Sequence, residues 1–78
     1  MSVTVIIYDK DHQIYDALNH IEKISYTKPY LNPIIVDVQG EELLTHSFPV
    51  NYDLHLYSPN ASYTINRHLL YDIRIEKE

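Results

Sequence analysis

The sequence predicts one small domain, mainly β, built as a small antiparallel barrel or sandwich of about six to eight short strands. Three observations predict this fold. Apolar and polar residues alternate along much of the chain, and successive side chains of a strand point to opposite faces. Tyrosine, a residue that favours strands, occurs eight times. Turn formers separate the apolar runs, and the length of 78 residues suits one β-rich domain, residues 1–78.

The first predicted strand is Val3–Tyr8, which is rich in β-branched residues and is followed by a polar turn.

Residues 12–23 allow two interpretations. Apolar side chains at i, i+4 and i+7 would suit one amphipathic helix at about 12–23, which gives an α+β fold. We favour strands at residues 13–15 and 21–26, with a turn near residues 16–19. Ile21 breaks the alternation, so this interpretation needs a bulge there or a strand that starts after it.

The middle of the chain predicts a loop and then a hairpin. Residues 27–33 contain two prolines, which cannot donate hydrogen bonds to a sheet, and therefore form a loop. The alternating run Ile34–Val38 is the next strand. The chain's one glycine, Gly40, suits the tip of a tight hairpin. Residues 43–48 would then form the returning strand.

Three further strands are expected in the last third of the chain, at residues 53–57, 63–65 and 69–75. The last of them has the most regular alternation. Its apolar side chains share one parity, and charged side chains occupy most of the other. We expect this strand to be central to packing, with an apolar inward face: Leu69, Tyr71, Ile73 and Ile75. Asp72, Arg74 and Glu76 should face water.

The composition argues against several classes of function. Cysteine is absent, so there is no disulfide, thiolate metal site or thiol nucleophile. One glycine cannot build a phosphate-binding loop. Eleven acidic and six basic residues give a net charge of −5, and binding to nucleic acid usually needs a basic face. A nucleic-acid-directed regulator or acidic mimic remains an alternative. No catalytic residue or cofactor is indicated.

The five histidines raise the alternative of a small metal- or ligand-binding module. His46 and His55 are the candidates, because we expect them on successive or nearby strands with carboxylates close by. Zinc sites need several ligands in a tetrahedral arrangement, and no usual metal-binding spacing occurs among the histidines. We therefore expect no metal, and the two residues stay weak candidates.

The remaining hypothesis is a binding function. Sheet edges recruit partner strands, and tyrosine is enriched at interface hot spots. We therefore predict a non-enzymatic module that binds a protein partner or itself. Its predicted interaction surface comprises Ile6, Tyr8, Ile35, His55 and Tyr57. The apolar run at residues 3–8 is too short to cross a bilayer, and no basic leader precedes it. We therefore expect a cytoplasmic protein with no membrane partner.

Four segments carry a resemblance: VTVIIYDKDHQIY at residues 3–15, HIEKISY at 20–26, SYTI at 62–65 and DIRIEK at 72–77. They resemble small, uncharacterised proteins encoded by phages and prophages of low-GC Gram-positive bacteria. The resemblance implies an accessory or morphogenetic protein that acts by binding rather than turnover, in the host cytoplasm or the virion. It also favours consecutive hairpins over a helix in residues 13–26, and it assigns a role to no individual residue.

Overall fold

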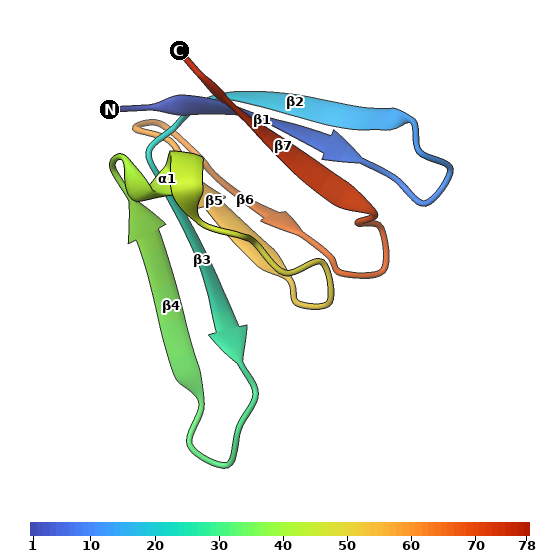
Figure 1. Cartoon of the computed structure of the whole chain (residues 1–78), viewed down its shortest axis with the longest axis vertical. Coiled ribbons are helices and arrows are strands. Elements are labelled where there is room, and N and C mark those ends of the chain that lie inside the picture. The colour runs from blue at the N-terminus through green and yellow to red at the C-terminus, as the bar shows by residue number, and fades with distance from the viewer.

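The computed structural model describes residues 1–78 as two antiparallel sheets and one short helix (Figure 1). The three-stranded sheet has the order β2-β1-β7, and the four-stranded sheet has the order β4-β3-β5-β6. The sheets form an open, sandwich-like arrangement that does not close into a barrel. The predicted mainly-β class is therefore confirmed. The elements are β1 (Val3–Tyr8), β2 (Ile14–Ile21), β3 (Lys23–Lys28), β4 (Ile34–Gln39), α1 (Glu42–Thr45), β5 (Leu54–Tyr57), β6 (Ser62–Ile65) and β7 (Asp72–Lys77).

The hydrophobic core lies between the two sheets and contains 13 buried residues. From the three-stranded sheet it takes the inward face of β1, where Val3, Val5 and Ile7 have no exposed surface. Leu54 and Leu56 of β5 are equally buried on the other sheet. Each such side chain contributes about 1.5–3 kcal/mol when it leaves water. The strict alternation of β1 and β5 thus holds the two sheets together.

Residues 14–21 form one strand, so the strand interpretation of this region is confirmed. The turn expected near residues 16–19 is wrong, because β2 runs through it while paired with β1. Val3 pairs with Ile21 and Val5 pairs with Leu18, so β2 holds one extra residue in this stretch. His20 lies there with a positive φ of 61°. This bulge returns Ile21 to the buried face, as its parity required.

The returning strand expected at residues 43–48 is also wrong. Gly40 makes the predicted turn with a φ of 66°, but the chain then enters α1. The amide of Leu43 donates to the Gly40 carbonyl at 3.1 Å, and that of His46 donates to the Glu42 carbonyl at 2.8 Å. Glutamate and leucine are good helix formers, and this segment has no β-branched residue before Thr45. The hairpin partner of β4 is instead β3.

The last strand begins later than its alternation predicts. A turn closed by the Leu69 amide and the Asn66 carbonyl (2.9 Å) delays β7 until Asp72. Leu70 is buried, while Leu69 and Tyr71 are exposed. Ile73 and Ile75 face the core as expected, but they are only half-buried. β7 is an edge strand and not a central one, because β1 alone pairs with it.

Candidate functional site

The β3–β4 hairpin extends beyond the sandwich as a two-stranded ribbon, which we name the arm (residues 26–36; Figure 1). β4 pairs with β3 along its whole length, from Gln39 to Ile34. β5 pairs with β3 only from Lys23 to Ser25. Past that point β3 has a strand neighbour on one side only. The arm therefore lacks a third strand beside β3, although Tyr26 and Val36 at its base still pack against the core.

An apolar row runs out of the core along β4 and into solvent. Val38, Val36 and Ile34 lie on one face of the strand because they alternate with Asp37 and Ile35. Val38 is 1 % exposed, Val36 is half-buried and Ile34 is 50 % exposed. On the opposite face Ile35 is 68 % exposed. The arm thus presents large aliphatic side chains to water on both faces.

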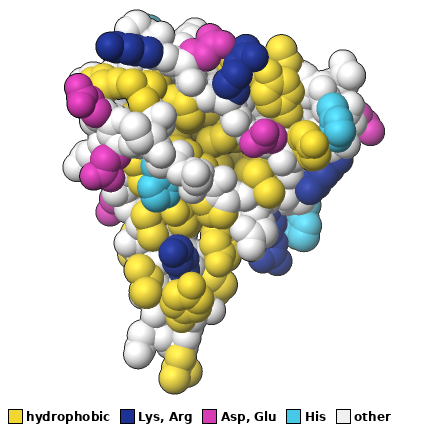
Figure 2. All heavy atoms as spheres, viewed as in Figure 1, with side chains coloured by type: hydrophobic (Ala, Val, Ile, Leu, Met, Phe, Trp, Pro, Cys, Tyr) yellow, Lys and Arg dark blue, Asp and Glu magenta, His cyan; other side chains and the backbone are white.

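The loop at the end of the arm continues this apolar surface. Leu31 is 99 % exposed, and Tyr30 beside it is also exposed. Pro29 and Pro33 flank the two residues, and their rings fix the backbone φ near −65°. Figure 2 shows hydrophobic side chains along the tapering arm. Scattered exposed hydrophobic residues are ordinary, but a contiguous group of them marks an interaction site.

An aromatic cluster fixes the base of the arm. The Tyr26 hydroxyl lies 2.7 Å from Nε2 of His46 in a hydrogen bond. The ring of Tyr52 stacks on that of Tyr26 at 5.9 Å and 9°, and His46 packs on Phe48 at 4.8 Å. Tyr26 is buried in this cluster although it stands where the arm leaves the sandwich. The arm therefore projects from a packed and hydrogen-bonded base.

The five residues predicted as an interaction surface do not form one patch. Ile35, His55 and Tyr57 lie on the outward face of the four-stranded sheet, since they alternate with core residues of β4 and β5. Ile6 lies on the outward face of the other sheet, where it is only 8 % exposed between its neighbours Ala17 and Arg74. Tyr8 is half-buried in that sheet. Of the five predicted residues, only Ile35 lies within the arm.

The two histidines weighed as metal ligands have different surroundings. The ring of His46 is hydrogen-bonded to Tyr26. Nδ1 of His55 lies 3.0 Å from the Thr64 hydroxyl, across the β5–β6 pair. No group of three or more His, Cys, Asp or Glu side chains lies together in the structure. Each imidazole is thus held by a neighbouring hydroxyl group.

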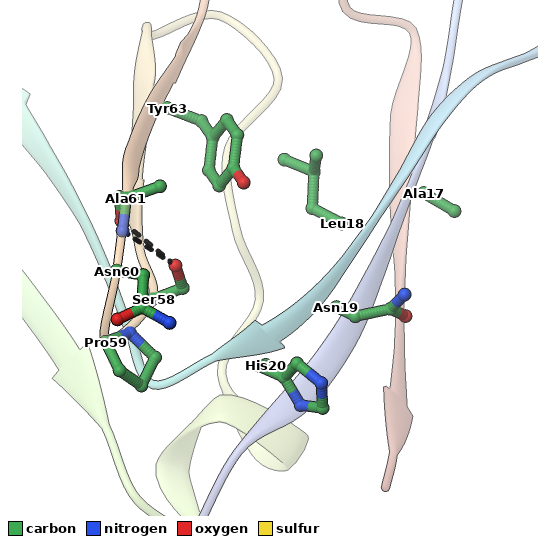
Figure 3. A pocket seen from close by; sticks show the side chains of 9 residues that line it. All are labelled: Ala17, Leu18, Asn19, His20, Ser58, Pro59, Asn60, Ala61 and Tyr63. Carbon is green, nitrogen blue, oxygen red and sulfur yellow. Dashed lines mark hydrogen bonds between the residues drawn. The ribbon is translucent and has the colours of Figure 1, made fainter.

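A groove of about 410 Å³ separates β2 from the β5–β6 turn (Figure 3). Leu18 and Tyr63 point toward one another across it. Some polar side chains at its rim have partners within the chain: Oδ1 of Asn19 lies 3.0 Å from the Thr4 hydroxyl, and Ser58 bonds to the Ala61 backbone at 3.1 Å. His20, also at the rim, bonds to Glu78. Asn60 and Tyr63 also line the groove and add an amide and a hydroxyl group to it.

Beside this groove, Glu78 ties the two ends of the chain together. Its carboxylate accepts hydrogen bonds from the hydroxyl groups of Ser2 (2.6 Å) and Thr4 (2.9 Å) and from the backbone N–H of His20 (2.9 Å). These donors, the Ser2 hydroxyl foremost, lower the pKa of Glu78 from 4.5 to about 2. The carboxylate therefore stays ionised throughout the ordinary pH range.

Comparisons with known proteins give no relative: no family model, curated protein or solved structure matches the chain. No helix of the structure is both long enough and apolar enough to span a bilayer.

Sequence reasoning selected Ile35 but missed Tyr30, Leu31 and Ile34, which make up most of the exposed apolar surface of the arm. A signal was present in the sequence. An apolar pair stands between two prolines at residues 29–33, directly before a β-branched strand. The exposure of Ile34 carried no such signal, because it depends on where β5 stops pairing with β3.

Proposed function

We propose that this chain is a non-enzymatic protein-interaction module and that the arm is its contact surface. The observation that carries the proposal is the exposure of Leu31, Ile34 and Ile35, which lie at the tip and on the two faces of a hairpin with a packed base. Covering one large aliphatic side chain contributes roughly 1.5–3 kcal/mol. Association costs several kcal/mol in lost freedom of motion. Because Ile34 is 50 % and Ile35 is 68 % exposed, covering them together with Leu31 recovers part of that cost, and the surrounding contacts supply the rest.

The surroundings of the polar groups also support binding over turnover. A general base has to reach its substrate with a free nitrogen or oxygen. His46 and His55 each have one of their two ring nitrogens engaged with a neighbouring hydroxyl, and no group of three or more His, Cys, Asp or Glu side chains lies together. The carboxylate of Glu78 is saturated by donors from its own chain. The resemblance to phage and prophage proteins extends the proposal to an accessory or structural role in a phage-related system.

The proposal is tested by removing apolar surface from the arm without touching the core. In the double variant Leu31→Ser with Ile34→Thr, both changes fall on exposed positions, so the fold should persist. Affinity capture with chemical cross-linking, in extracts of the source cell, measures what the tagged protein binds. Light scattering measures its mass. We expect the variant to lose at least about tenfold in binding, which corresponds to about 1.4 kcal/mol.

The matched control is Ile14→Thr, which removes an exposed isoleucine from β2, far from the arm in the sheet order. It should bind like the original protein. Equal capture and equal mass for the arm variant and the original protein would contradict the proposal. So would an original protein that is monomeric and captures nothing.

A further inference from the structure

We propose that the partner of the arm is a second copy of this chain, joined to the first by antiparallel pairing of β4 with β4. The inference rests on the proposed function and names its partner. Two-fold dimers are the commonest assemblies, and in them one surface contacts the same surface of the other copy. The pairing would join the two four-stranded sheets into one continuous sheet through their exposed edges.

The four edge strands differ in how well they are protected against such pairing. Native proteins protect edges with charges, bulges or short strands. β7 carries Asp72, Arg74, Glu76 and Lys77. β2 has two irregularities in its register, and β6 has only four residues. β4 has six residues, an unbroken register with β3 and only one charged residue, Asp37. β4 is therefore the edge best suited to accept another strand.

The side chains of β4 select a particular register. In an antiparallel pair, residues directly opposite each other point to the same face of the sheet. With Val36 on the two-fold axis, Ile34 lies beside Val38 of the second copy. Both rows of apolar side chains then meet on one face, and the exposed Ile34 is covered. This register also pairs Ile35 with Asp37 of the second copy.

The charge of Asp37 disfavours the neighbouring register. An axis at residue 37 would place the two Asp37 carboxylates directly opposite each other, and like charges in that position are destabilising. An axis at residue 35 would bring Pro33 opposite Asp37, at a position where proline has no N–H to donate. The axis at Val36 avoids both problems.

The same register gives the exposed tip of the arm something to contact. Residue 34 lies opposite residue 38 of the second copy. The loop at residues 29–33 of the first copy therefore extends toward the segment that follows β4 in the second copy. That segment is α1, where Leu44 is exposed. Leu31, the most exposed apolar side chain in the protein, would therefore lie at the end of the second copy that carries α1 and its exposed Leu44. The two-fold axis gives this arrangement twice.

The first test substitutes Ile35, an exposed position at which a new charge should not disturb folding. Ile35→Glu places a carboxylate opposite Asp37 of the second copy, whereas Ile35→Lys places a cation there. We expect Glu to produce monomers and Lys to preserve dimers, as measured by light scattering over about a hundredfold range of concentration. Both variants lose the same apolar side chain, so a difference between them reports the register. Ile14→Glu is the control at an exposed isoleucine of another edge, and it should remain dimeric.

The second test uses the absence of cysteine. Residues opposite each other in an antiparallel pair have Cα atoms about 4.5–5.5 Å apart, which a disulfide can bridge. Val36→Cys on the axis should therefore form a covalent dimer under mild oxidation. Ile34→Cys, on the same face of the same strand, should not, because the two copies of residue 34 lie about 13 Å apart.

The outcomes separate this inference from the proposed function. A chain that is monomeric throughout overturns the second copy as partner, and the proposed function then depends on whether the arm variant loses capture of another protein. A dimer that survives Ile35→Glu but is lost with Ile14→Glu overturns both, because it places the contact at the far edge of the other sheet. A dimer lost equally with Ile35→Glu and Ile35→Lys overturns the register with Val36 on the axis.

Discussion

At the scale of single residues, Glu78 is the carboxylate that the fold perturbs most. It is exposed, yet it accepts hydrogen bonds from Ser2, Thr4 and the backbone of His20. These three donors come from β2 and from the N-terminal segment and strand β1. The bulge that gives His20 its positive φ also turns its N–H toward Glu78. One acidic side chain thereby connects the two outer strands of the three-stranded sheet across β1.

We predict that Glu78→Gln removes a pH-dependent part of the stability. The folded pKa of about 2 lies below the ordinary value of 4.5, so the ionised form stabilises the folded state above pH 4.5. This contribution is lost as the pH falls from 4.5 through about 2, because the carboxylate is protonated first in the unfolded state and then in the folded state. The melting temperatures of the two proteins should differ at about pH 6, where Glu78 is ionised in both states. They should converge as the pH falls through about 2.

The control for this prediction is Glu76→Gln. Glu76 pairs with Arg74 at 2.8 Å, but both side chains are about half exposed, and such pairs contribute little. Its melting curve should follow that of the original protein at every pH. A gap between Glu78→Gln and the original protein that stays constant across the acid range would contradict the assignment.

At the scale of elements, the aromatic base decides how firmly the arm is held. A two-stranded hairpin alone is marginal in water. Here Tyr26 connects the arm to the segment after α1 through His46, Phe48 and Tyr52. That segment has no strand pairing of its own. The cluster therefore stabilises the arm and the irregular segment together.

Tyr26→Phe should test this coupling. The change removes the hydrogen bond to Nε2 of His46 and keeps the ring that stacks on Tyr52. We expect a loss of about 1 kcal/mol, which lowers the melting temperature of a domain this size by roughly 4–8 °C. Tyr30→Phe, at the exposed tip, is the matched control and should melt unchanged. An unchanged melting temperature for Tyr26→Phe would show that the hydrogen bond contributes nothing.

The elements also show what alternation can and cannot predict. It identified β1, β4, β5 and β6 because each has apolar residues at every second position and polar residues or turns at its ends. It failed at residues 43–48, where helix propensity and the burial of Leu43 decided the local structure. It failed again at residues 69–71, because the turn that begins at Asn66 shifted the parity and buried Leu70 instead of Leu69.

At the scale of the whole molecule, the exposure of the candidate interaction surface depends on how far distant strands pair with each other. No local sequence pattern shows the extent of that pairing. Ile35 could be predicted to face away from the core from its parity alone. The exposure of Ile34 could not, since its parity is that of the buried Val38. It follows from the short pairing of β5 with β3. A local pattern gives the face of a side chain, but the extent of neighbouring strands decides whether that face is covered.

The strand order of the three-stranded sheet has a consequence for how the chain folds. β1 pairs with β7 from Val3 with Lys77 to Tyr8 with Asp72, so this pairing joins residues more than about sixty positions apart, and such non-local pairings form slowly. The four-stranded sheet uses the contiguous residues 23–65. During synthesis the four-stranded sheet can therefore form first, because β1 cannot pair with β7 until residues 72–77 have been made. Pulse-labelled hydrogen exchange should show amides of β3 protected before those of β7, and the reverse order would refute this sequence of events.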